Sequence, residues 1–275
     1  MAATETAAGD GHASTTAYEV IAIRYGSLTA LKSELYYRHA SYGEPDGEVE
    51  MAYWFWILRD GSETILVDTG FAPEAGARRG RTCLRAPLDA LRDVGIEPGD
   101  VSTVIVTHMH YDHIGNLAAF PHARLTVPRR ELDFWTSPTA RRAQFASHVE
   151  EAEVEQLERA ARDGRVRLLD GVEEIREGIT AHCVGGHSPG QQVTIVETGS
   201  GVVALASDAV HFYEELELDR PFGVIADLER MYAAYDLLRE LGGSGAVLVP
   251  GHDPQVASRY PALGTGPSAL AVRVA

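Results

Sequence analysis

The residues best suited to chemistry in this 275-residue sequence are the histidines and aspartates of one short segment. Thr107 to His113 read THMHYDH, an H-x-H-x-D-H pattern with three histidines and one aspartate in a row of six residues. Packing of a hydrophobic core gives no reason for such a cluster, whereas imidazole and carboxylate groups are ligands of zinc and similar ions. The segment therefore predicts a metal centre.

The order of the residues in this segment suits two ions better than one. Along an extended backbone, alternation would place His108, His110 and Asp112 on one side. His113 directly follows Asp112 and would point elsewhere. A catalytic zinc typically keeps three protein ligands and one open position. Two ions therefore need more ligands than this segment holds.

Further candidate ligands lie just beyond short apolar runs that predict β-strands. Loops beyond the carboxyl ends of strands are where open α/β sheets bind their ligands. The runs and the residues that follow them are Thr103–Val106 with His108, Ile179–Val184 with His187, Val202–Ala206 with Asp208, and Ala246–Val249 with His252. The complete set of predicted ligands is His108, His110, Asp112, His113, His187, Asp208 and His252.

The elements that must position these ligands alternate between strands and helices. Period-two and apolar runs predict further strands, and helical spacing of apolar residues predicts helices between them. This intermixing is typical of a layered α/β architecture. Residues 17–275 show no linker and are predicted to form a single metallo-hydrolase domain, whereas the Ala- and Thr-rich residues 1–16 are predicted to be a disordered leader.

Composition limits the partners that such a domain would have. The formal net charge is −16, which opposes binding to nucleic acid or to an anionic membrane surface. The longest apolar run, Ala52–Leu58, is far shorter than the ~20 residues that cross a bilayer, and two cysteines make no disulfide framework. We expect a cytoplasmic protein with a small, weakly polar substrate. The aromatic run 52–56, if partly exposed, would favour a homodimer.

Five short motifs together resemble those of the metallo-β-lactamase superfamily. The resemblance spans residues 18–260 and implies an α/β fold of the αββα sandwich type, with two mixed β-sheets flanked by helices. Two metal ions would lie at one edge of the paired sheets. The motifs are H-x-H-x-D-H at 108–113, GGHSPG at 185–190, Ser-Asp-Ala at 207–209, Pro-Gly-His-Asp at 250–253 and Asp-Thr-Gly at 68–70.

The resemblance also distributes the ligands between two Zn²⁺ ions. It implies that Asp68 orients a ligating histidine through the other ring nitrogen; an aspartate that only caps a turn is the alternative. The implied ligands are His108, His110 and His187 for the first ion and Asp112, His113 and His252 for the second, with Asp208 bridging the two.

Within the superfamily, the sequence resembles the N-acyl homoserine lactonase group, whose members act in quorum quenching. True β-lactamases have Cys where Asp208 stands, so antibiotic hydrolysis is not expected. These lactonases commonly place a Tyr three residues after the bridging Asp to contact the substrate carbonyl. Here that position is His211, followed by Phe212 and Tyr213. Either His211 or Tyr213 could take this catalytic role, and a solvent-exposed loop histidine is the alternative for His211.

The implied activity is hydrolysis of a small lactone, such as an N-acyl homoserine lactone, by a metal-bound hydroxide. Asp112 would also act as a proton shuttle. Two other functions use the same ligands. A thioesterase or amide hydrolase would share the metal centre, and a non-catalytic metal-binding protein would be expected to lack some of the seven ligands.

Overall fold

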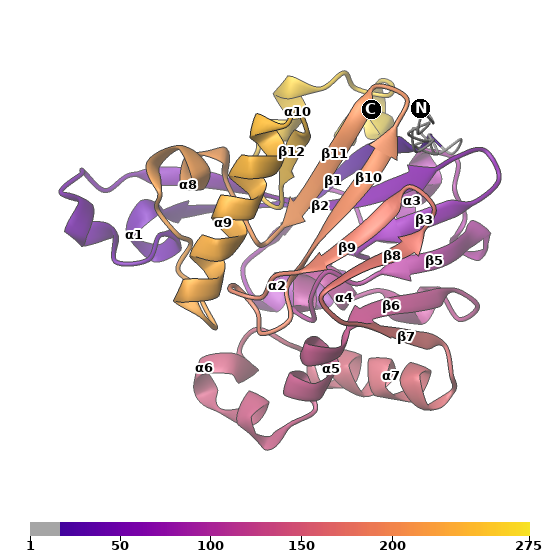
Figure 1. Cartoon of the computed structure of the whole chain (residues 1–275), viewed down its shortest axis with the longest axis horizontal. Helices are drawn as coiled ribbons and strands as arrows, with labels where there is room; N and C mark the ends of the chain where they lie inside the picture. The colour runs from indigo at the N-terminus through magenta and orange to yellow at the C-terminus, as the bar shows by residue number, and fades with distance from the viewer. Residues whose placement is uncertain (1–16) are drawn as a thin grey trace, which may run out of the picture.

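The computed structural model describes residues 17–275, apart from the side chains of residues 267 and 268. The predicted leader, 1–16, lies outside this range, and the assignment of 17–275 to one domain stays a prediction. Two β-sheets lie face to face, and helices cover their outer sides (Figure 1). No helix among the described residues has both the length and the apolar character needed to cross a membrane.

The first sheet has eight strands in the order β13-β1-β2-β3-β5-β6-β7, with β4 paired to β1. Antiparallel pairs join β13 to β1, β1 to β2 and β2 to β3, whereas β3, β5, β6 and β7 run parallel. The strands are β1 Glu19–Leu31, β2 Glu48–Arg59, β3 Thr64–Val67, β4 Thr82–Cys83, β5 Val101–Ile105, β6 Arg124–Pro128, β7 Val166–Leu169 and β13 Ala271–Arg273.

The second sheet has five strands in the order β12-β11-β10-β9-β8. Its strands are antiparallel except for the parallel pair β11 and β12. Both sheets are therefore mixed, which confirms the predicted sandwich class. The strands are β8 Val172–Arg176, β9 Ile179–Cys183, β10 Gln192–Thr198, β11 Gly201–Ser207 and β12 Val247–Pro250.

The helices are mostly short, and the long ones cover the sheets. In Figure 1, α9 lies along the second sheet, while α5, α6 and α7 gather beside β6 and β7. The α-helices are α1 Lys32–Leu35, α2 Pro73–Arg78, α3 Pro87–Asp93, α4 Tyr111–Ile114, α5 Arg129–Trp135, α6 Ala143–Ala146, α7 Glu151–Arg162, α8 Tyr213–Leu218, α9 Leu228–Gly243 and α10 Val256–Arg259. Short 3-10 turns are His39–Tyr42, Pro98–Asp100, Leu117–Ala119, Pro138–Arg141 and Gly266–Leu270.

Strand β2 supplies side chains to two hydrophobic layers because successive residues of a strand face opposite ways. Trp54 and Trp56 pack between the sheets with apolar residues of β9 to β12. Tyr53 and Phe55 face the helix-covered side. Residues 52–56 are at most 1% exposed. The partly exposed aromatic run that favoured a homodimer is therefore absent, because both faces of β2 are covered within the chain.

The four strands that precede the ligands end within one residue of their predicted ends. The prediction of an extended 107–113 segment is wrong in its second half. Tyr111–Ile114 forms the helical turn α4, in which the His110 carbonyl accepts hydrogen bonds from the backbone N–H groups of His113 and Ile114 at 3.0 and 3.3 Å. The turn gives Asp112 and His113 a different direction from the loop residues His108 and His110.

Candidate metal centre

Loops at one edge of the sandwich bring all seven predicted ligands together. Each is at most 6% exposed. His108 and His110 lie in the loop between β5 and α4, and Asp112 and His113 lie in α4 itself. The remaining three come from the second sheet: His187 follows β9, Asp208 follows β11 and His252 follows β12.

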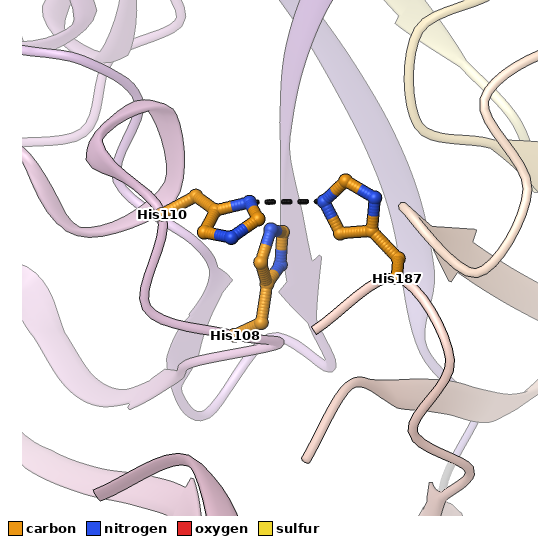
Figure 2. A group of neighbouring side chains, drawn as sticks. All are labelled: His108, His110 and His187. Atoms are coloured by element: carbon orange, nitrogen blue, oxygen red, sulfur yellow. Dashed lines mark hydrogen bonds between the residues drawn. The ribbon is translucent and has the colours of Figure 1, made fainter. Parts of the chain in front are cut away.

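His108, His110 and His187 form what we call the first ligand group. Each offers a ring nitrogen, and these atoms lie within 4.8 Å of one another. Figure 2 shows the three rings converging, with His110 and His187 on opposite sides of His108. Nε2 of His187 lies 2.9 Å from Nδ1 of His110. The group therefore joins a loop of the first sheet to a loop of the second.

Asp112, His113 and His252 form the second ligand group, whose ligand atoms also lie within 4.8 Å of one another. Oδ2 of Asp112 is 3.7 Å from Nε2 of His113 and 3.8 Å from Nε2 of His252. Nδ1 of His252 lies 2.8 Å from the carbonyl oxygen of Ala52 in β2. This contact leaves Nε2 of His252 to face the other members of the group.

Asp208 lies between the two groups, and its two carboxylate oxygens face different sides. Oδ2 is 3.3 Å from Nε2 of His187 and 3.8 Å from Nε2 of His108. Oδ1 is 3.3 Å from Nε2 of His113 and 3.1 Å from Nε2 of His252, which is equally close to Oδ2. A carboxylate placed in this way can bridge two ions.

Buried nitrogen atoms without hydrogen-bond partners test whether the residues fit a metal ion. Nε2 of His108 and Nε2 of His113 are both buried and make no hydrogen bond. Such an atom costs ~1–3 kcal/mol when nothing satisfies it, and coordination of a cation would satisfy it. Five imidazoles with two carboxylates suit zinc and related first-row ions. The residues therefore fit a metal centre.

The pKa values of the histidines of the first ligand group and of Asp208 are both shifted by their surroundings. Burial lowers the pKa values of His108, His110 and His187 well below the usual range, and neighbouring imidazoles lower them further. These rings are neutral, which is the form that binds metal ions. Burial would raise the pKa of Asp208, but His252, His113 and other histidines outweigh it and hold that pKa well below its usual range. Asp208 is therefore an anion among imidazoles.

Asp68 has the contacts that the family resemblance implied. It lies directly after β3 and is fully buried, with a left-handed backbone φ of 64°. Oδ2 is 2.7 Å from Nδ1 of His113, and it also accepts a hydrogen bond from the Thr107 hydroxyl at 2.7 Å. Oδ1 accepts from the Thr107 backbone N–H at 2.8 Å. Asp68 thus fixes the ring that presents Nε2 to the second ligand group.

Glu131 is a buried carboxylate that sequence reasoning missed. It lies in the first turn of α5 with no exposed surface. Oε2 accepts hydrogen bonds from the Met109 N–H at 2.9 Å and from Nε1 of Trp135 at 2.7 Å. Oε1 accepts from the Ser188 hydroxyl at 2.6 Å and from the Gly190 N–H at 2.5 Å. Glu131 therefore ties the His108–His110 loop to the His187 loop.

The two candidates for contact with the substrate carbonyl lie in different places. His211 is fully buried, so it is not the solvent-exposed loop residue that was the alternative, and its ring stacks on Phe222 with centroids 3.7 Å apart. Tyr213 begins α8, and its hydroxyl donates a hydrogen bond to the Leu248 carbonyl at 3.2 Å. Arg259 lies over the Tyr213 ring. The structure therefore brings His211, and not Tyr213, to the ligand cluster.

Two glycines beside the ligands allow close contacts between backbone segments. A Cβ at Gly251 would lie 2.7 Å from the backbone of Ser207 and 2.8 Å from Oδ1 of Asp208. Gly186 has a φ of 103°, and its Cβ would lie 2.7 Å from the Met231 backbone. Real side chains do not reach such distances, so the loops before His187 and His252 can approach their neighbours only with glycine at these positions.

A narrow cavity opens beside the first ligand group. Besides His110 and His187, most of its lining is apolar or aromatic. A second cavity shares Phe145, Pro189 and Ala226 with it and reaches charged residues at the start of α5. The residues that line the first cavity are His110, Trp135, Gln144, Phe145, His148, His187, Pro189, Val224, Ile225 and Ala226.

Comparisons with known proteins identify the family to which this chain belongs. The family model of the metallo-β-lactamase superfamily matches residues 49–257. N-acyl homoserine lactonase AiiA of Bacillus thuringiensis subsp. kurstaki is 28% identical over 193 residues, covering 65% of this chain and 72% of that protein. Metallo-beta-lactamase domain-containing protein 1 of Xenopus laevis is 29% identical over 199 residues, covering 72% and 69%.

A solved structure of an N-acyl homoserine lactone hydrolase, with N-hexanoyl-L-homoserine at its catalytic metal center, matches with a TM-score of 0.72. It is 23% identical, and the match covers 90% of this chain and 98% of that chain. The chain belongs to the metallo-β-lactamase superfamily. It is a hydrolase of that superfamily related to the N-acyl homoserine lactonases, which confirms the predicted family and enzyme class.

Proposed function

We propose that this protein is a dinuclear zinc hydrolase that opens the ring of an N-acyl homoserine lactone or a related small lactone. The observation that carries the proposal is the position of Asp208, which presents one carboxylate oxygen to each ligand group. The family relationship to lactonases supports the choice of substrate.

The seven side chains have separate tasks in this proposal. The first ligand group would hold one ion, the second ligand group the other, and Asp208 would bridge them. When bound, the two ions supply Lewis acidity and make a water nucleophilic near neutral pH. Asp112 is also proposed to carry a proton toward the leaving oxygen, because its carboxylate lies within the second group and the residue keeps 6% of its surface exposed. Asp68 and Glu131 would keep the imidazoles in place.

The apolar side chains beside the first ligand group are compatible with a substrate that has an apolar acyl part. Trp135, Phe145, Val224 and Ile225 supply apolar walls next to His110. The chain carries a net charge of −16, which disfavours an anionic substrate at long range. A neutral N-acyl lactone meets both conditions.

Acid release tests the proposal directly, because opening a lactone at neutral pH yields a carboxylate and a proton. Zinc-loaded and chelator-stripped protein should be compared in weak buffer against homoserine lactones of increasing acyl length. We expect metal-dependent acid release. If protein that holds about two zinc ions per chain opens no lactone, the lactonase proposal is wrong, and thioesters and amides then decide between the remaining hydrolase activities.

A further inference from the structure

His211 lies among the ligand atoms although it belongs to neither ligand group. It follows Asp208 by three residues and has no exposed surface. Its Nε2 is 3.2 Å from Oδ2 of Asp208, closer than Nε2 of His187 at 3.3 Å or Nε2 of His108 at 3.8 Å. His187, Asp208 and His211 offer ligand atoms within 4.8 Å of one another.

The ring nitrogens of His211 are buried and make no hydrogen bond. This holds for Nε2 even though Oδ2 of Asp208 is only 3.2 Å away. Nε2 of His113 has the same relation to Oδ1 of Asp208, at 3.3 Å. A nitrogen and a carboxylate oxygen that are close but not bonded to each other can share a third partner, and a cation is a partner that both attract.

The other side of the His211 ring also faces a buried carboxylate, as His113 does, although at a longer distance and without a hydrogen bond. Nδ1 of His113 faces the buried carboxylate of Asp68, and Nδ1 of His211 lies 3.4 Å from Oε1 of Glu215, which is also fully buried. A carboxylate on one ring nitrogen and a metal ion on the other is the common arrangement of ligating histidines.

The ring of His211 is also fixed in direction. Its face stacks on Phe222 at an interplanar angle of 13°. Glu215 is held in turn, because its Oε1 accepts hydrogen bonds from the backbone N–H groups of His211 and Phe212 at 2.6 and 2.9 Å, and Tyr235 donates its hydroxyl to Oε2. A ring held in this way keeps Nε2 directed at Asp208 without help from solvent or substrate.

We propose that His211 is a ligand of the metal centre and binds, through Nε2, the divalent transition-metal ion that His187 and Asp208 also hold. The proposal rests on the metal centre proposed above and not on the lactone substrate. It replaces contact with a substrate carbonyl as the role of His211, and it gives a reason why this side chain is buried as deeply as His108.

Cadmium substitution tests this assignment in the wild-type chain. Protein labelled with ¹⁵N in its histidines and loaded with ¹¹³Cd should show one-bond coupling at every imidazole nitrogen that binds the metal. We expect six coupled imidazoles: three from the first ligand group, two from the second, and His211. The His211 ring should carry its proton on Nδ1, facing Glu215. Five coupled imidazoles, with a proton on Nε2 of His211, would overturn the proposal.

Variants identify the signal and measure its effect on affinity. His211→Gln should remove one coupled resonance and weaken binding of one ion by more than the ~10- to 100-fold that loss of an outer contact costs. Glu215→Gln should keep the coupling and weaken the same ion within that range. His182→Gln, which changes a histidine in β9, should alter neither measurement. Unchanged affinity in His211→Gln would contradict the proposal, as would wild-type protein that takes up no metal.

These measurements do not depend on catalysis. A chain that shows six coupled imidazoles and opens no lactone would support the ligand assignment while refuting the proposed substrate. A chain that opens lactones and shows five would do the reverse.

Discussion

The two ligand groups of this centre are held in different ways. In the second group, Nδ1 of His113 contacts Asp68 at the end of β3, and Nδ1 of His252 contacts the Ala52 carbonyl in β2. In the first group, the ligand loops are held by Glu131, which reaches them from α5. One half of the site is thus built on the first sheet, whereas the other depends on a helical carboxylate placed between two loops.

Because of this difference, we expect the two proposed ions to respond to different outer residues. Asp68 contacts His113 of the second group directly, whereas its link to the first group runs through the Thr107 hydroxyl, which lies 3.1 Å from Nδ1 of His108. Glu131 contacts Met109, Trp135, Ser188 and Gly190, beside the first group. Asp208 faces both groups through its carboxylate.

Asp208→Asn should have the largest effect, because it removes the charge that both halves share. We expect lactone turnover to fall by more than the ~100-fold upper range for loss of an outer contact, with metal content reduced and the fold retained by circular dichroism. Asp163→Asn, an exposed aspartate after α7, is the matched control and should behave as wild type. Full turnover by Asp208→Asn would rule out the bridging role.

Asp68→Asn and Glu131→Gln should each weaken a different ion by about 10- to 100-fold. The first changes the partner of Nδ1 of His113, and the second removes an anionic acceptor of four hydrogen bonds. Chelator competition with ¹¹³Cd-loaded protein would show which of two cadmium resonances is lost first. Exposed Glu155→Gln is the control. Loss of the same resonance in both variants would show that the halves are not independent.

Gly251→Ala should disturb both halves through the backbone. Its Cβ would meet the Ser207 backbone at 2.7 Å and Oδ1 of Asp208 at 2.8 Å. We expect a loss of about 1–3 kcal/mol in the free energy of unfolding, typical of overpacking, together with weaker binding of both ions. Denaturant unfolding and metal titration measure the two effects, and Gly99→Ala, where a Cβ meets nothing within 4 Å, is the control.

Glu153 in α7 is another buried glutamate, but it lacks the hydrogen-bond donors that surround Glu131. Its Oε2 makes no hydrogen bond, and burial, with Glu150 adding to it, raises the pKa of Glu153 from 4.5 to about 8. The folded state therefore keeps a proton that the unfolded state loses above about pH 4.5, so this group makes stability fall as pH rises toward 8.

Glu153→Gln removes that ionisation. We expect its melting temperature to match wild type near pH 5 and to exceed it by a few degrees near pH 9. Calorimetry of the metal-free proteins from pH 5 to 9 measures the difference. A constant offset between the two proteins at every pH would contradict the raised pKa.

The sequence predicted well which side chains the structure brings together and where the strands end, because each motif lies directly after an apolar run. It predicted Asp68 through family resemblance. Glu131 and Glu215 could not be predicted, because a single glutamate in a short polar helix has the same pattern whether it faces water or a ligand loop. The burial of His211 could not be predicted either, since it depends on Phe222 and Glu215 packing around a loop residue.

The attachment of His252 to Ala52 has a consequence for how the protein acquires metal. The two residues are 200 positions apart, and two hydrogen bonds of 2.8 Å join them, one from the Ala52 N–H to the His252 carbonyl and one between Nδ1 and the Ala52 carbonyl. Closing so long a loop is slow and entropically costly. A ribosome-bound chain that has not yet emerged past β12 lacks His252, so the proposed second ion would be bound tightly only after synthesis has passed residue 252.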